Sequence, residues 1–177
     1  MSLASIDKFK SSFKHGFVHP NLFRIQFTGG PAFLHKDGVN EMMSLACKSA
    51  QIPGTTFPEE KYYHNGRYMK FVNGADYDPF TMVFLVDDTD KLGGSKIISV
   101  MDDWNAAIYD YEKGKFGFKN DYKADLIISM FNRAGTMIYQ SKLLGVYPVN
   151  ITSFDLSYDT KTTIMDYEVS FNFDQFG

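Results

Sequence analysis

Disulfides, membrane spans and export signals have little support in this sequence. Cys47 is the single cysteine of the 177 residues, which excludes an internal disulfide and suits synthesis in a reducing compartment. No apolar run approaches the ~20 residues that are needed to span a bilayer. Lys8, Lys10 and Lys14 interrupt the N-terminal stretch in which a signal peptide would have its apolar core. The sequence therefore predicts a soluble protein without a visible export signal.

Positive charge and metal ligands are scarce as well. With 18 Lys and Arg against 21 Asp and Glu the net charge is −3, whereas ordinary nucleic-acid binding needs a cationic surface. The four histidines share no metal-ligand spacing with one another or with the cysteine; they are His15, His19, His35 and His64. Cys47 has no obvious histidine base, so we interpret it as a small apolar core residue. Without an assembled catalytic group, the sequence predicts no metal, no cofactor and no enzymatic activity.

Aromatic residues, by contrast, are abundant. The chain has 17 Phe and 11 Tyr, and 44% of its residues are apolar, which is enough for one hydrophobic core at this length. Phe and Tyr favour both β-strands and protein interfaces. For any single aromatic residue, alternation along a strand favours the core over an interface. We expect one domain over residues 1–177.

Several segments alternate apolar and polar residues with period two, as half-buried strands do. The pattern predicts strands over residues 22–28, 43–49, 79–86, 122–131 and 136–144. Asn65-Gly66 lies between two aromatic segments and predicts a β-hairpin over residues 59–72. Residues 33–42 are ambiguous, and a turn signal within them favours a loop or a small hairpin.

Apolar residues at helical spacing occur in two places. After Ser95 they predict one long helix over residues 96–111, with Ser95 as its N-cap. Residues 5–15 show the same spacing and predict a short amphipathic helix or an ordered arm. With about eight or nine strands and one main helix, the sequence predicts a mainly β fold, either a β-sandwich or a small barrel.

The last two predicted strands form a hairpin with one apolar and one acidic face. Residues 153–158 and 165–173 alternate, and the apolar face carries Phe154, Leu156, Tyr158, Met165, Tyr167, Val169, Phe171 and Phe173. The polar face carries four carboxylates and no Lys or Arg; they are Asp155, Asp166, Glu168 and Asp174. Because like charges on neighbouring strands repel each other, this one-signed face needs a functional explanation.

Five stretches between residue 19 and the C-terminus, taken together and in order, carry a resemblance to a known family. They are His19-Pro20-Asn21-Leu22-Phe23, Cys47-Lys48-Ser49-Ala50, Asp103-Trp104, Gly145-Val146-Tyr147-Pro148-Val149-Asn150-Ile151 and the acidic closing hairpin. In this order they resemble the tail-tube proteins of contractile-tailed bacteriophages. The chain departs from that family in residues 29–42, which are longer than expected, and in Tyr147, which supplies the ring before Pro148.

The resemblance implies a β-sandwich or barrel tail-tube fold flanked by a helix. It further implies hexameric rings, stacked into the hollow inner tube of a contractile tail, through which the genome is ejected. The expected partners are other copies of the chain, the tail sheath protein, the baseplate or initiator proteins and the tail terminator. The protein would be assembled in the host cytoplasm and located in the virion tail, without insertion into a membrane.

The sequence leaves other functions open. Tube proteins of type VI secretion systems and of extracellular contractile injection systems are related in architecture. A β-barrel module that binds a small apolar ligand is an alternative from a different class.

The predicted hairpin over residues 59–72 is our candidate for a contact between rings. A tube subunit needs contacts that close a ring and contacts that stack rings, and such contacts are rich in aromatic residues. The candidate residues are Phe57, Lys61, Tyr62, Tyr63, Arg67, Tyr68 and Lys70. The alternative is an exposed surface hairpin without a partner.

The acidic face of the closing hairpin is our candidate for part of the tube lumen. Carboxylates repel DNA phosphates, so a lumen lined with Asp155, Asp166, Glu168 and Asp174 would let DNA pass without specific binding. The alternative is an outer surface on which these acidic groups meet a cationic sheath. The sequence does not decide between the two orientations.

Overall fold

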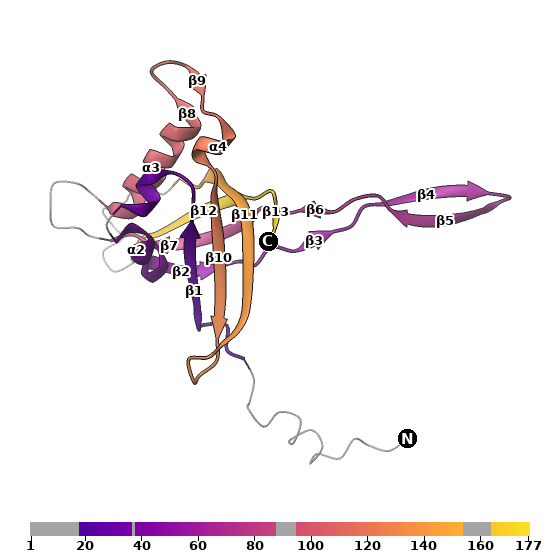
Figure 1. Ribbon diagram of the computed structural model, residues 1–177, viewed down its shortest axis with the longest axis horizontal. Helices are drawn as coiled ribbons and strands as arrows, with labels where there is room; N and C mark the ends of the chain where they lie inside the picture. The colour runs from indigo at the N-terminus through magenta and orange to yellow at the C-terminus, as the bar shows by residue number, and fades with distance from the viewer. Residues whose placement is uncertain (1–17, 37, 88–94, 154–163) are drawn as a thin grey trace, which may run out of the picture.

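The computed structural model describes residues 18–36, 38–87, 95–153 and 164–177. Most of its elements are β-strands (Figure 1). The strands are β1 (Phe23–Thr28), β2 (Cys47–Ala50), β3 (Thr55–Thr56), β4 (Glu59–His64), β5 (Arg67–Val72), β6 (Asp76–Tyr77), β7 (Phe80–Leu85), β8 (Tyr109–Asp110), β9 (Lys115–Phe116), β10 (Ala124–Phe131), β11 (Met137–Ile151), β12 (Asp166–Asn172) and β13 (Gln175–Phe176). The helices are the 3-10 helix η1 (Ala32–His35), α2 (Val39–Ala46), α3 (Lys96–Ile108) and α4 (Lys119–Tyr122). The predicted mainly β fold with one main helix is confirmed.

Seven strands form one antiparallel sheet, in which the long strand β11 belongs to both halves. The order is β1-β10-β11-β12-β7-β2, and β13 also pairs with β11. β11 has 15 residues; its first part pairs with β10, and its residues 147–151 pair with β12. In Figure 1, β1 and β10 stand upright whereas β7 and β12 run across the view, so the two halves of the sheet cross. Gly145 has a φ of 70° within β11, and a side chain there would collide with the Asp174 carboxylate.

The hydrophobic core lies between the crossing halves and α3. Alternate residues of the strands point into it; among them are Ile25, Phe27, Phe80, Met82, Phe84, Tyr167, Val169 and Phe171. α3 contributes the Trp104 ring, whose centroid lies 5.6 Å from that of Phe27 and 5.8 Å from that of Phe171. The indole N–H of Trp104 donates a 2.6 Å hydrogen bond to the carbonyl of Tyr122. One side chain therefore joins the main helix to both halves of the sheet.

A side-chain amide covers part of the free edge of β1. The Phe27 N–H donates to Oδ1 of Asn40 at 2.9 Å, and the Asn40 amide donates back to the Phe27 carbonyl at 2.5 Å. Asn40 lies on α2 and so takes the place of a neighbouring strand at this point. Covering an edge in this way blocks pairing with other chains there.

Several predictions for individual elements are confirmed. The segments 22–28, 79–86 and 122–131 contain β1, β7 and β10. The predicted hairpin over residues 59–72 is β4 and β5, and its turn residues Asn65 and Gly66 have φ values of 46° and 74°. Positive φ at both central residues is the geometry of a type I′ turn, which the Asn-Gly pair favours.

The region from 33 to 49 differs from its prediction. The sequence predicts a loop or small hairpin over residues 33–42 and a strand over 43–49, but these residues form η1, α2 and only the short strand β2. Val39, Met42, Met43 and Ala46 follow helical spacing and face the core. Gly38, which suggests a turn, is the N-cap of α2 and has a φ of 74°.

Two further corrections concern α3 and β11. The predicted helix over residues 96–111 ends at Ile108, because Tyr109 starts β8. Ser95 stands at the N-cap position but makes no capping hydrogen bond with its side chain, and its hydroxyl donates to Asp87 at 2.6 Å instead. The strand predicted over residues 136–144 continues to Ile151 as β11.

The closing strand is not half of an isolated two-stranded hairpin. β12 lies between residues 147–151 of β11 and strand β7. The alternation predicted for its residues is confirmed, since Tyr167, Val169, Phe171 and the following Phe173 are buried. The segment 154–163, with Asp155, and the helix predicted over residues 5–15 lie outside the described residues. No described helix is long and apolar enough to cross a membrane.

Replacing the central ring of the core should destabilise the fold strongly. Trp104→Ala is expected to lower the free energy of unfolding by about 3–5 kcal/mol, because it removes a fully buried aromatic ring and leaves a cavity. Urea unfolding of the dilute protein measures this change. Phe118→Ala, at a side chain that is 81% exposed, is the control and should change the value by less than about 0.5 kcal/mol. A loss below about 1 kcal/mol for Trp104→Ala would contradict this description of the core.

Candidate functional site

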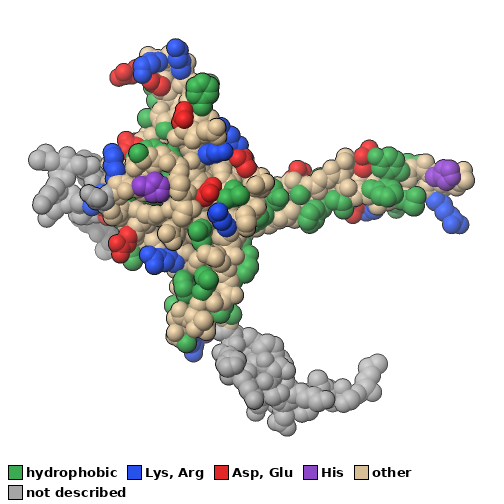
Figure 2. Space-filling view, viewed as in Figure 1, with side chains coloured by type: hydrophobic (Ala, Val, Ile, Leu, Met, Phe, Trp, Pro, Cys, Tyr) green, Lys and Arg blue, Asp and Glu red, His purple; other side chains and the backbone are tan. Residues whose placement is uncertain are grey.

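A β-hairpin projects from the body of the protein (Figure 1). We call residues 55–77 the arm; β3 and β6 form its base, and β4 and β5 form its outer part. All twelve residues of β4 and β5 are exposed. Figure 2 shows apolar side chains along the length of the arm.

The register of the outer arm sorts its side chains onto two faces. On one face Tyr63 lies opposite Tyr68, with their ring centroids 5.8 Å apart. On the other face Tyr62 lies opposite Met69, and the Tyr62 ring centroid is 5.5 Å from that of Phe71. Both faces of the arm are therefore partly apolar.

The arm carries basic residues beside its rings. The Lys61 ammonium lies 5.5 Å from the Tyr68 ring centroid, and Lys70 forms a 2.5 Å ion pair with Glu59. Arg67 makes no ion pair with any described residue. The tip of the arm, residues 61–70, contains Lys61, Arg67 and Lys70 and no acidic residue.

The apolar exposure of the arm makes it a candidate contact surface. Tyr63 is 75% exposed and Met69 is 60% exposed, and further exposed apolar side chains are Phe57, Tyr62, Tyr68, Phe71 and Val72. Contiguous exposed apolar surface marks a contact site, and a two-stranded hairpin alone is at best marginally stable in water. The seven residues predicted from the sequence all lie on this arm.

An aromatic anchor at the base of the arm was missed in the sequence. The Tyr77 ring, in β6, lies 5.2 Å from the Phe173 ring and 5.3 Å from the Phe176 ring, centroid to centroid. These contacts hold the base against the C-terminal strands. Tyr77 lies outside the alternating segments, so period two gave no signal for it.

The acidic residues of the closing hairpin have more positive charge beside them in the fold than the sequence suggests. Asp166 forms a 2.5 Å ion pair with Lys48 of β2. Asp174 lies in the bend between β12 and β13 and pairs with Lys119 of α4. The hydrogen bond to Asp174 raises the pKa of Lys119, whose ammonium also lies 5.2 Å from the Tyr147 ring centroid. Cations from other elements therefore lie beside two of the carboxylates, although the hairpin itself contributes none. Among the three described carboxylates, Glu168 alone is exposed without an ion pair to a described residue.

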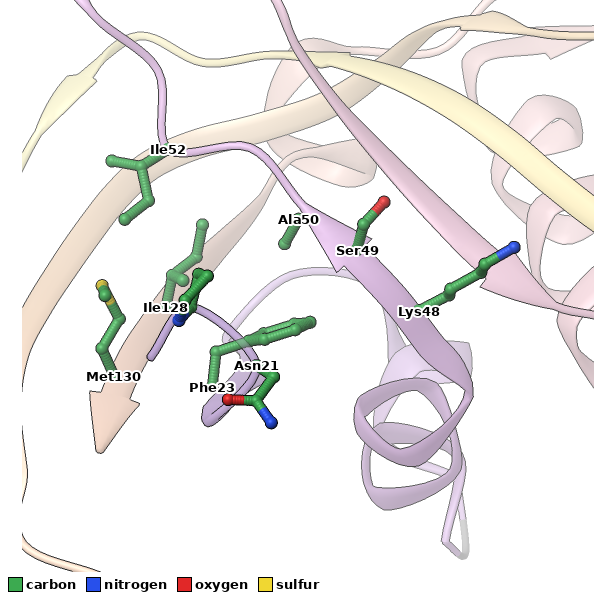
Figure 3. Close-up of a pocket in the computed structure, with 9 residues that line it drawn as sticks. Asn21, Phe23, Lys48, Ser49, Ala50, Ile52, Ile128 and Met130 are labelled. Carbon is green, nitrogen blue, oxygen red and sulfur yellow. The ribbon is translucent and has the colours of Figure 1, made fainter. Parts of the chain in front are cut away.

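An apolar groove lies between the outermost strands β1 and β2 (Figure 3). Its volume is about 330 Å³, and its lining includes Phe23, Ile52, Ile128 and Met130, with Asn21 and Lys48 also beside it. Lys48 is the single charged side chain of the described lining, and its ion-pair partner Asp166 lies outside that lining. We see no arrangement for acid–base chemistry in it.

The described residues contain no group of three or more His, Cys, Asp or Glu side chains that could hold a metal ion. His35 makes a 2.7 Å hydrogen bond with the Gly29 carbonyl, and His19 contacts Arg133. Burial raises the pKa of the Cys47 thiol to about 12, so the thiol stays protonated. The interpretation of Cys47 as a core residue is confirmed by its burial.

The sequence model of the family described as "Phage tail tube protein" matches residues 9–177, which is nearly the whole chain. No curated protein matches the sequence.

Solved structures of contractile injection systems share the fold. A chain from the sheath/tube terminator of an extracellular contractile injection system (PVC) has 17% identity and a TM-score of 0.61, over 90% of this chain and 94% of that chain. A chain from the tube terminating cap of the anti-feeding prophage has 16% identity and a TM-score of 0.65, over 91% of this chain and 89% of that chain. A chain from the PVC sheath-tube complex has 15% identity and a TM-score of 0.60, over 98% of this chain and 97% of that chain.

Proposed function

We propose that this chain, which belongs to the phage tail tube protein family, is the repeating subunit of the inner tube of a contractile tail. The family consists of structural tube proteins, and the chain is not an enzyme. In our proposal six copies form a ring, the rings stack into a hollow tube, and the phage genome passes through that tube into the host. The family match over residues 9–177 argues against the alternative of a β-barrel module that binds a small ligand.

The exposed arm is the observation that carries this proposal. A stacked tube needs contacts that repeat from subunit to subunit without closing, in addition to those that close the ring. The arm offers an apolar surface that its own chain does not cover, on a segment that reaches away from the body (Figure 1). We therefore propose that the arm contacts a subunit of a neighbouring ring. The alternative, an exposed hairpin without a partner, leaves seven large apolar side chains in water.

The proposed partners follow from the position of a tube inside a contractile tail. They are the sheath around the tube, the baseplate or initiator proteins at one end and the terminator at the other. Three similar structures come from a sheath-tube complex, a baseplate and a tube terminator of injection systems, which supports these partners. The tube would be part of the virion tail and be assembled in the host cytoplasm.

A second candidate is the tube of an extracellular contractile injection system. The solved structures with this fold favour it, because they come from such systems. The genes beside the coding sequence separate the two candidates. Capsid genes beside a sheath gene support a phage tail, and a sheath gene without capsid genes supports an injection system.

We also propose that the outer face of β12 contributes to the tube lumen, with Glu168 as its main uncompensated charge. Lys48 and Lys119 offset Asp166 and Asp174, so the three described carboxylates leave a net charge of −1 with these two cations. A negative lumen repels DNA and keeps it mobile. The alternative is that this face meets the sheath.

Concentrated purified protein is expected to form hollow tubes of stacked rings in negative-stain electron microscopy. Tyr63→Ser combined with Met69→Ser removes one exposed apolar side chain from each face of the arm, and this variant should form no tubes while keeping its unfolding free energy within about 0.5 kcal/mol. The matched control is Tyr111→Ser combined with Phe118→Ser, which removes exposed rings outside the arm. Monodisperse particles of the unmodified protein at high concentration would contradict the proposal.

Glu168→Lys tests the lumen. The variant should form tubes of normal length, because the side chain is exposed on β12 and is not part of the arm. Virions that carry it should deliver their genome more slowly, since a new ammonium in each subunit attracts DNA phosphates. Ejection kinetics measure the effect, with Glu112→Lys, at another exposed position, as a control of the same charge change. Normal tubes with unchanged genome delivery would refute the lumen assignment.

A further inference from the structure

A second groove lies at the opposite end of the body from the arm. We call it the α2 groove; it is lined by Gly38, Glu41, Met42, Leu45, Ala46, Leu85, Val86 and Asp87 and has a volume of about 480 Å³. Figure 1 shows α2 and the arm on opposite sides of the body. The chain order agrees with this, because β7 begins three residues after Tyr77 at the base of the arm and ends at Leu85 in the groove.

The α2 groove is apolar and acidic. Leu45 is 79% exposed and supplies an apolar side chain to the groove surface. Glu41 is exposed and makes no ion pair with any described residue. Asp87 accepts a hydrogen bond from Ser95 at 2.6 Å. The described part of the lining contains the carboxylates of Glu41 and Asp87 and no Lys or Arg. Glu41 can therefore attract a cationic partner with an apolar surface.

The tip of the arm has the complementary chemistry. It carries three cations and no acid, and one of its faces brings Arg67 together with Tyr62 and Met69. Figure 2 shows a basic side chain and a histidine at the far end of the arm. Arg67 lacks an ion pair with the described residues, as Glu41 does, so each has its charge available for a partner. A guanidinium and a carboxylate can form two parallel hydrogen bonds.

The placement of the two surfaces favours a contact between copies that repeats. A projecting element at one end and its receptor at the other form a heterologous, head-to-tail contact. Such a contact closes into a ring where the rotation between copies closes, and otherwise it continues from one copy to the next, which is what the stacking of rings requires.

We propose that the arm tip of one copy docks in the α2 groove of another copy, with Arg67 facing Glu41 and with Tyr62 and Met69 covering Leu45. This inference rests on the proposed tube function and names the surface that receives the arm. It assigns α2 to the contact between rings.

A charge swap tests the contact. Glu41→Arg and Arg67→Glu should each raise the critical concentration for tube assembly by at least about tenfold, because each places like charges against each other. The double variant with both substitutions should restore assembly to within about threefold of the unmodified protein, since it rebuilds the pair in reverse. Sedimentation of assembled protein measures these values. Asp103→Arg, the same charge change on an exposed position of α3, is the control and should assemble normally.

The outcomes separate this inference from the function on which it rests. If the unmodified protein forms no tubes, the proposed function fails and the inference fails with it. If it forms tubes and Glu41→Arg assembles equally well, the inference alone is overturned. The inference is also overturned if the double variant assembles no better than the single ones. Glu41→Gln, which keeps the size of the side chain, should weaken assembly by about threefold and guards against misfolding of the Arg variant.

Discussion

The contact of Trp104 with Phe27 and Phe171 holds the two halves of the sheet and the main helix in one body. The long strand β11 connects those halves through the backbone, and this aromatic contact fixes how they cross. The rest of the molecule depends on that rigidity. Tyr77 packs against Phe173 and Phe176 at the edge of the same core, so the arm leaves the body from a fixed base. A rigid base is what a repeating contact between subunits needs, because each copy must present the arm in the same direction.

The described chain does not cover the side chains of its own outer arm. A two-stranded ribbon has no core of its own, and the rings on its two faces make contacts only with neighbours on the same face. The apolar groove beside α2 has the opposite shape and the opposite charge, at the other end of the body. In our proposal these two surfaces have a common explanation, since each would complete the other when copies of this tail tube protein stack.

Local signals in the sequence predicted part of this account well. Asn65-Gly66 predicts the arm because a type I′ turn is decided by two residues, and alternation predicts the buried face of β12 because it depends on one strand. Helix α2 was missed because its helical spacing covers only eight residues and follows a competing turn signal at Gly38. The ion pairs of the acidic face were missed because Lys48 and Lys119 stand 118 and 55 residues from their partners. Only the tertiary fold brings them there.

Hydrogen exchange of the arm amides tests most directly the claim that the arm is completed by another copy. In the dilute protein the amides of residues 59–72 should exchange rapidly, because every residue of the two strands is exposed and the ribbon has no core of its own. In assembled tubes the same amides should exchange at least about a hundredfold more slowly, since a neighbouring subunit covers them. Equal exchange rates for residues 59–72 in the dilute and the assembled protein would contradict the account.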